Sequence, residues 1–467
     1  MRPVPNKLLL WIAFVFVIPA CTILFYDDGA ARFVAIVCLL GIVLVCLGDF
    51  FLSRSLLKAV DLEVPELIRG TKGRTTTFYL EFSLTGSDLG WVRYGLNAAP
   101  FFRFESDPIG RISPLKAGRK TRAAVEIIPL QRGGFSLDVL FLETRSQLGL
   151  WLMRRRFDFE IELRVYPDLT LERKRLASLF LMHGQDGTHI VRQVGKGRDF
   201  EQLREYQPGD DYVDIDWKAT ARRGIPVTRT YQIEKTQEVY VVADHSRLSA
   251  REIRVPIEEN QGGDWLYEEQ SSGGDYLVTT QMEKFLHCSL ILASVAERQG
   301  DRFGFVSFAD NVSRFIRGRN GKEHYNLVRD ALYTLEPEPV APDFEQLMIA
   351  LRQRLTRRAL LVMLVDLSDP LTAEQFFEAL PLINRQHLVL VHMVKPEHAH
   401  PLFSGRVDPE TISEVYEEFG GHFQWQEIRE TRNKLHHLGV ELSTPDHAEL
   451  CTEAVTQYLN VKNRQLI

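Results

Sequence analysis

The stretch EVYVVAD, residues 238–244, decides how the larger part of this chain folds. It is a short, continuous apolar run that ends in an acid, which is typical of a strand buried in a parallel sheet. The run ALLVMLVD, residues 359–366, ends in an acid in the same way, and helical patterns separate the two runs. Strands that alternate with helices predict a doubly wound α/β sheet. Ligand sites in such sheets lie at the carboxyl ends of the strands, where we expect Asp244 and Asp366.

Shorter segments nearer the amino terminus alternate with a period of two. In TFYLEFSL, residues 77–84, every second residue is apolar. In FSLDVLFLE, residues 135–143, the same alternation places every second residue from Phe135 to Phe141 on one apolar face. Strict alternation is typical of half-buried antiparallel strands. Gly-containing turn signals separate these segments. Residues 60–168 are therefore predicted to form a small all-β, sandwich-like domain.

Two long apolar runs open the chain. Residues 8–26 contain no charge, and residues 33–52 contain only Asp49. Each run reaches the roughly 17–25 residues that a helix needs to cross a bilayer. Residues 1–55 are therefore predicted to be a transmembrane helical hairpin, which holds the protein in the membrane through residues 8–52.

The charges around these runs predict an orientation. Arg2 and Lys7 precede the first run and Arg54 and Lys58 follow the second, whereas the link between the runs contains Asp27 and Asp28 against Arg32. The positive-inside rule then places both ends, and everything after residue 55, in the cytoplasm of a bacterial-type plasma (inner) membrane. An alternative is that IPAC, residues 18–21, is a lipoprotein cleavage box with Cys21 as the acylated residue.

Length and composition are those of an ordinary globular protein of several domains. The chain has 467 residues, of which 45% are hydrophobic and 25% charged, and a formal net charge of −6. An acidic balance argues against a surface that coats nucleic acid, so no nucleic-acid partner is expected. The five cysteines are scattered without metal-ligand spacing, which favours a reducing compartment and no disulfide framework.

The segment from residue 197 to residue 231 bunches acids and bases around a Pro-Gly-Asp turn and a Trp. We interpret it as a salt-bridged collar that fastens the β domain to the α/β domain, with Asp216 and Trp217 facing inward along with Ile215. Arg204 and Arg222 are expected to form forked pairs with Asp210 and Asp216. The predicted structural network consists of Arg204, Tyr206, Gly209, Asp210, Asp216, Trp217 and Arg222.

A metal-dependent hydrolase or nuclease is the enzymatic alternative for the same segment. Asp211, Asp216 and Lys218, within the Asp-rich residues 210–218, imitate a paired-acid and Lys motif in which acids hold Mg²⁺. No basic surface is evident that could hold a polyanion. The chain also has no Gly-rich phosphate loop and no nucleophile elbow.

Several long motifs, in the same order, resemble the domain-of-unknown-function 58 family. They are the segment just described, LQRGGFSLDVLFLETRSQLGLW, VYPDL and the closing VTQYLNVKNRQLI. The resemblance spans residues from about 60 to the carboxyl terminus. It implies a von Willebrand factor type A-like domain and a MoxR-type AAA+ ATPase as a partner, but no reaction. The resulting domains are 1–55 (transmembrane hairpin), 60–168 (β domain), 169–237 (connecting signature segment) and 238–467 (α/β domain).

The resemblance also implies a candidate metal site. In the von Willebrand fold an Asp-x-Ser-x-Ser loop, a Thr and an Asp hold Mg²⁺, and Asp244, Ser246 and Asp366 match three of these positions. Leu248 and Pro342 stand where the second Ser and the Thr belong. Because Mg²⁺ demands near-ideal oxygen geometry, we expect weak or absent binding.

If no metal is bound, a positive group is still expected beside the two acids, because like charges repel and raise a pKa. Arg247, or an Arg from a partner, could supply it. The following acidic segment, Leu248–Tyr276, is long for a connection. It is either a surface insertion or a lid or partner-binding loop.

These observations predict a membrane-anchored, non-enzymatic binding and assembly protein. It would act as an adaptor or substrate receptor for the ATPase. The hydrolase and a purely structural membrane protein remain as alternatives, and the sequence names no client.

Overall fold

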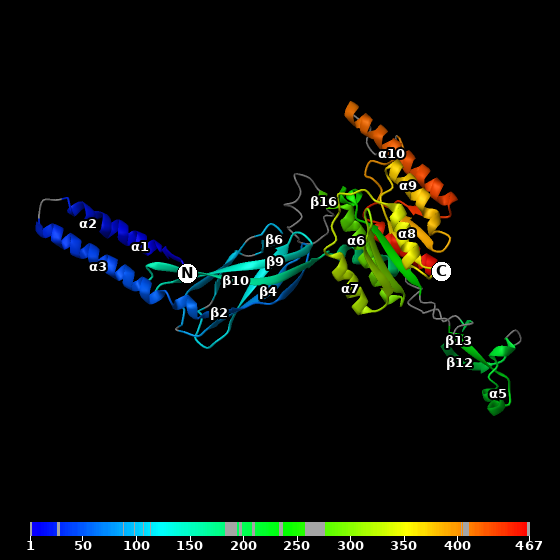
Figure 1. Cartoon of the computed structure of the whole chain (residues 1–467), viewed down its shortest axis with the longest axis horizontal. Helices are drawn as coiled ribbons and strands as arrows, with labels where there is room; N and C mark the ends of the chain where they lie inside the picture. Colours follow the sequence, from blue (N-terminus) through cyan, green and yellow to red (C-terminus); the bar gives the residue numbers. More distant parts are fainter. Residues whose placement is uncertain are drawn as a thin grey trace. The chain divides into compact units, whose positions relative to one another are not determined.

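The structure is a computed structural model of the whole chain, and it divides into two compact units, Met1–Asp168 and Leu169–Ile467 (Figure 1). Each unit is described by itself. The residues that the structure describes are 2–25, 29–86, 88–97, 99–105, 107–112, 114–182, 194–195, 199–207, 211–232, 237–256, 276–402, 404 and 411–464.

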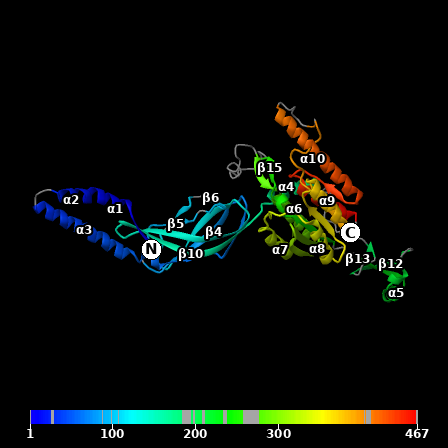
Figure 2. The same ribbon diagram turned by 45° about the horizontal axis from the view of Figure 1, so that its top comes forward.

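The first unit begins with a strand and two apolar helical segments that lie side by side in both views (Figures 1 and 2). The elements are β1 (Arg2–Pro5), α1 (Lys7–Ile12), the π-helical η1 (Ala13–Val17), α2 (Ile18–Ile23), α3 (Gly29–Ser53) and η2 (Leu56–Ala59). Among the described residues, one helix is long and apolar enough to cross a membrane, Gly29–Ala59, with a mean hydropathy of 2.7 in its most apolar window. The apolar helix Lys7–Ile23 is shorter, so the first of the two spans stays a prediction.

Two β-sheets enclose the core of this unit. One sheet has the order β1-β10-β9-β5-β7, with β3 paired to β10, and the other has the order β2-β4-β8-β6. Strand β1 precedes the apolar helices in the chain, yet it pairs with β10. The remaining strands are β2 (Val60–Glu63), β3 (Leu67–Thr71), β4 (Thr76–Leu84), β5 (Val92–Leu96), β6 (Phe102–Phe104), β7 (Ile109–Ile112), β8 (Thr121–Pro129), β9 (Gly133–Arg145) and β10 (Trp151–Tyr166).

Asp49, the acid in the second apolar run, joins α3 to the turn between β9 and β10. The side chain is 1% exposed. It accepts hydrogen bonds from Ser146 Oγ at 2.6 Å and from the Leu148 backbone N–H at 3.0 Å. One turn further along the helix, Ser53 Oγ accepts from the Gln147 N–H at 3.0 Å. A carboxylate in an apolar helix is therefore explained by the backbone and hydroxyl donors that it satisfies.

The second unit contains a six-stranded sheet in the order β18-β17-β14-β19-β20-β21. All neighbouring strands are parallel except β18, which is antiparallel to β17. Numbered along the chain, the order is 3-2-1-4-5-6, the doubly wound order whose switch point lies between the first and fourth strands, here β14 and β19. The strands are β14 (Glu238–Asp244), β17 (Arg302–Phe308), β18 (Val312–Arg319), β19 (Leu360–Leu364), β20 (Leu388–His392) and β21 (Glu441–Ser443).

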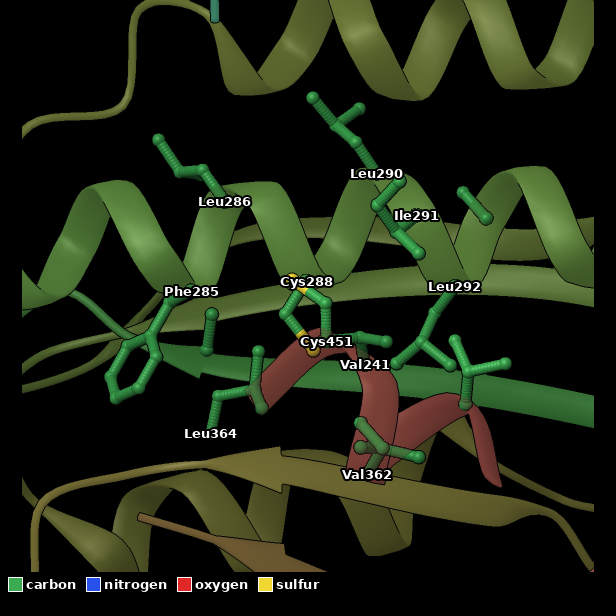
Figure 3. Close-up of a cluster of buried hydrophobic side chains, with 14 of the residues drawn as sticks. Val241, Phe285, Leu286, Cys288, Leu290, Ile291, Leu292, Val362, Leu364 and Cys451 are labelled. Atoms are coloured by element: carbon green, nitrogen blue, oxygen red, sulfur yellow. The ribbon is translucent and has the colours of Figure 1, made fainter. Parts of the chain in front are cut away.

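Helices cover both faces of this sheet, and each face has its own apolar core. On one face, α6 and α11 pack over β14 and β19, and the buried, free thiols of Cys288 and Cys451 lie close together between them (Figure 3). The helices of that face are α4 (Thr170–Met182), α6 (Gln281–Arg298), α7 (Lys322–Leu332) and α11 (Leu450–Asn463). The other face is covered by α8 (Phe344–Arg354), α9 (Pro370–Ala379), the short η5 (Leu380–Leu382) and α10 (Ile412–His437).

Two smaller sheets belong to the same unit. The signature segment forms a three-stranded sheet, β11-β13-β12, and a hairpin pairs β15 with β16. Of the predicted lid or insertion, residues 257–275 lie outside the described part of the chain. The elements are β11 (Val194–Gly195), β12 (Asp199–Glu205), η3 (Tyr212–Asp214), α5 (Trp217–Arg223), β13 (Val227–Gln232), η4 (Arg247–Ala250), β15 (Glu252–Pro256) and β16 (Tyr276–Thr280).

Candidate functional site

The candidate site lies at the carboxyl edge of the six-stranded sheet, at its switch point. Strand β14 ends at Asp244, and Asp366 follows two residues after the end of its neighbour β19. Both carboxylates are buried, with Asp244 at 0% and Asp366 at 2% exposure. The structure therefore places the two predicted acids on adjacent strands at the edge where this fold binds ligands.

The loop after β14 is held by Asp244 and Ser246. Asp244 Oδ1 accepts the Ser246 N–H at 2.7 Å, and Ser246 Oγ accepts the Leu248 N–H at 3.3 Å. Within the described chain, Asp244 Oδ2 has no hydrogen-bond partner. Burial raises the pKa of Asp244 to about 6, and the charge of Asp366 adds to the rise although the bonds from Ser246 oppose it. The negative charge of ionised Asp244 is thus poorly compensated, and burial away from water disfavours this charged form.

A positive group does stand beside the acids, but it is Arg251. Its Nη1 lies 3.0 Å from Asp366 Oδ2 and donates to Ser368 Oγ at 3.0 Å. Asp366 Oδ1 also accepts the Ser368 N–H at 3.0 Å. Arg247, the residue named as the example in the sequence analysis, instead acts on Asp369, where bonds from Thr372 lower the acid's pKa and the Arg247 charge adds to this.

The residue between Asp244 and Ser246 ties the loop to its surroundings, a role that the sequence analysis did not identify. His245 is 1% exposed, and its Nε2 lies 2.9 Å from Ser313 Oγ and 3.2 Å from Glu338 Oε1. Its backbone N–H donates to Phe308 O at 2.9 Å, and its carbonyl accepts the Glu338 N–H at 2.7 Å. The signal that could have indicated this role is a His directly after a buried strand, where polar side chains need partners.

The side chains at this site do not supply the oxygen ligands that Mg²⁺ requires. The ion requires six oxygen-type ligands in near-octahedral geometry, but Leu248 and Pro342 carry no hydroxyl at two of the expected positions. The next acid, Asp343, is used as the N-cap of α8, where it accepts the Gln346 N–H at 2.9 Å. Among the residues described here, no group of three or more His, Cys, Asp or Glu side chains could hold a metal ion. The Arg251 guanidinium is already in contact with Asp366, the second of the two acids.

The predicted structural network lies in the small sheet and α5, not at this edge. Asp216 caps α5 by accepting the Lys218 and Ala219 N–H groups at 3.0 and 2.9 Å, and its other oxygen pairs with Arg229 Nε at 2.9 Å. Because both of its oxygens are engaged, Asp216 is a poor metal ligand for the hydrolase alternative. The expected pairing of Asp216 with Arg204 or Arg222 is wrong, since Arg229 on β13 takes that place.

The expectation that Trp217 faces inward is also wrong. Trp217 is 69% exposed, and the apolar anchors of the segment are Ile215 at 8% and Val227 at 0%. The reason is local: the N-cap bonds of Asp216 begin α5 at Trp217, whereas Ile215, one residue before the cap, bridges to β13.

The other members of the predicted network have different positions. Tyr206 stacks on Tyr212 with ring centroids 6.0 Å apart, and Arg222 is exposed in the last turn of α5. Gly209 and Asp210 lie outside the described residues. Arg204, on β12, donates to the Glu205 carbonyl at 3.4 Å.

Comparisons with known proteins find a family that is similar to part of this chain. The family described as "Protein of unknown function DUF58" matches residues 202–251 and 245–416. The uncharacterized protein YeaD of Bacillus subtilis (strain 168) is 24% identical over 139 residues, which make up 30% of this chain and 35% of YeaD. The chain thus matches about a third of that relative's length.

Solved structures of low similarity were also found. An aerotolerance-related membrane protein from Bacteroides fragilis NCTC 9343 is 14% identical, with 48% of this chain and 98% of that chain covered and a TM-score of 0.27. The conserved hypothetical protein BatB from Bacteroides thetaiotaomicron is 13% identical, with 49% and 99% covered and a TM-score of 0.28. These values are too low to support an argument about function. The chain is thus similar to the DUF58 family over residues 202–416, and the strand order of its second unit fits the von Willebrand factor type A-like domain that this resemblance implies.

Proposed function

We propose that this protein is a membrane-anchored, non-enzymatic binding and assembly protein, an adaptor or substrate receptor for a MoxR-type AAA+ ATPase. The ATPase, or a client that it acts on, would dock on the carboxyl edge of the six-stranded sheet. The observation that supports this proposal most is the Arg251–Asp366 ion pair. It gives a positive side chain of the protein itself to Asp366, one of the acids that the family resemblance assigns to Mg²⁺.

The rim of the edge offers charges to a partner. Arg247 is exposed, and the side chains of Arg251 and Glu338 are 45% and 49% exposed. Beneath them, Asp244, His245 and Asp366 are buried and fix the loops that present the rim. Rim charges of this kind set the encounter rate and the orientation of a partner more than its final affinity.

The membrane anchor is proposed to be a hairpin of two spans, with the soluble parts in the cytoplasm of a bacterial-type plasma membrane. The long apolar helix that contains α3 supports one span. Arg54 and Lys58 follow α3 and support a cytoplasmic location for what comes next. Retention of a cytoplasmic ATPase by the protein expressed in cells requires this orientation. The experiment below therefore also tests this orientation against the alternative of an exported lipoprotein acylated at Cys21.

The experiment is a co-purification from cells that express the full chain together with the MoxR-type ATPase. The wild-type chain should retain the ATPase, and Arg247→Glu should retain about tenfold less, because a reversed rim charge repels the partner. Lys322→Glu is the matched control: it makes the same charge change on an exposed residue, at the start of α7. We expect it to behave as wild type.

Two outcomes would contradict the proposal. Equal retention of the ATPase by Arg247→Glu and Lys322→Glu would show that the ATPase does not dock on the carboxyl edge of the sheet. Failure of the wild-type chain to retain the ATPase would favour a purely structural membrane protein.

A further inference from the structure

The signature segment exposes three large apolar side chains beside a basic helix, α5, although Asp211 and Asp214 flank two of them. Tyr212, Val213 and Trp217 are 74%, 88% and 69% exposed. The helix α5 that begins at Trp217 contains Lys218, Arg222 and Arg223 and no acid. We call these six residues the basic aromatic surface. Trp, Tyr and Arg are the residues that contribute most to protein interfaces.

This surface is held in a defined shape from behind. Ile215 and Val227 are buried beneath it, and the Asp216–Arg229 ion pair joins the start of α5 to β13. Gly224, with φ 71°, ends α5 in the left-handed conformation that a glycine adopts without strain. The exposed side chains are therefore presented by a fixed scaffold, and their exposure is not the result of an unfinished core.

A second exposed apolar surface lies on α10. Its members recur at the spacing of one helix face, and they are exposed to different extents. They are Ile412 (78%), Val415 (36%), Tyr416 (74%), Phe419 (44%) and Phe423 (61%). We call them the α10 stripe.

The charge around the α10 stripe has the opposite sign. From Ile412 to Ile428 the helix contains Glu414, Glu417, Glu418 and Glu427 and no Lys or Arg. This half of α10 extends beyond α9 in both views (Figures 1 and 2).

The opposite side of α10 is already used for packing. A Cβ added at Gly421 would lie 1.9 Å from the His398 carbonyl oxygen, so the helix approaches that backbone closely. Ile428 is 5% exposed and, with Trp425, packs into the core on that face of the sheet. The stripe cannot turn inward without breaking these contacts, and within the described residues its side chains stay exposed.

We propose that the α10 stripe of one copy docks on the basic aromatic surface of a second copy of this chain. Both surfaces present aromatic side chains, and the Lys and Arg side chains of α5 are complementary in charge to the glutamates of the α10 helix. Two different surfaces that bind each other give a head-to-tail contact, which closes into a ring or extends into a filament. The acidic helix disfavours an anionic lipid surface as its partner, because the two would repel each other.

The experiment measures the association of the full chain in detergent by sedimentation over a range of concentrations. The wild type should form oligomers. The reversal Arg222→Glu with Arg223→Glu should weaken association at least about tenfold, as should Glu417→Lys with Glu427→Lys. Arg357→Glu with Arg358→Glu, an exposed arginine pair elsewhere in the same unit, is the matched control and should leave association unchanged.

Mixing the two weakened variants decides between a contact within one chain and a contact between copies. The glutamates introduced in α5 of one variant are complementary to the lysines introduced in α10 of the other. The mixture should therefore associate more strongly than either variant alone. A mixture that stays dissociated would overturn the proposal. A wild-type chain that is monomeric at every concentration, or reversals that act no differently from the control pair, would also overturn it.

Discussion

Replacing Asp244 by asparagine should stabilise the protein at pH 7.5, and the gain should disappear near pH 4. Burial raises the pKa of this carboxyl group from 3.8 to about 6. Between these two values the folded protein binds the proton and the unfolded chain does not, so stability falls as the pH rises through this window. Above it, the ionised carboxylate costs on the order of 2–3 kcal/mol. Asparagine keeps the acceptor for the Ser246 N–H without that charge.

The measurement is the melting temperature of the full chain in detergent at the two pH values. Asp310→Asn, which changes an exposed aspartate at the turn between β17 and β18, is the control and should have little effect. If Asp244→Asn lowered the melting temperature at pH 7.5, the carboxylate would have a favourable counter-charge, such as a bound cation. The site would then hold a positive group beside Asp244 in addition to Arg251.

Replacing Asp49 by alanine should destabilise the first unit by about 2–5 kcal/mol. The change strands the hydroxyl of Ser146 and the N–H of Leu148, and a buried donor without a partner costs roughly 1–3 kcal/mol. Ser53 would also lose the acceptor for its hydroxyl, at 3.3 Å. Hydrogen exchange of the β9–β10 turn in the detergent-solubilised chain should report faster opening.

A matched alanine substitution is available in the same unit. Asp61 is exposed on β2, so Asp61→Ala should leave exchange at the turn unchanged. If the two substitutions gave equal exchange, Asp49 would not be what joins α3 to the β domain.

The sequence predicted best where one pattern has one structural solution. The apolar runs that end in Asp244 and Asp366 are the buried parallel strand β14 and, in the second case, β19 with the short loop after it. Every second residue of β4 from Phe78 to Leu84 is buried, as alternation indicated. In these segments the period of the side chains leaves no choice of face.

The sequence-based prediction failed where an irregularity in strand pairing or a helix cap decides which side chains face the core. Phe141 was expected on the inner face of β9 but is 46% exposed, whereas Leu140 and Leu142 are buried. The register between β9 and β10 shifts between Asp158 and Ile161, and a one-residue shift exchanges the two faces of a strand.

The site shows the same limit. Its acids follow from their strands, but Arg251 comes from beyond η4. Nothing in its spacing distinguished it from Arg247, since only the path of the loop brings one of the two to Asp366.

Arg251, and not a divalent cation, is the positive group at the docking edge, where it pairs with Asp366 and, among the described residues, leaves Asp244 without a counter-charge. Calorimetric titration of the full chain with Mg²⁺ and Mn²⁺ tests this claim most directly, with Asp244→Ala titrated in parallel. Because the hydroxyl ligands are missing and a guanidinium already contacts Asp366, we expect no saturable heat up to millimolar metal from either protein. Saturable binding below millimolar metal by the wild type, lost in Asp244→Ala, would contradict the claim.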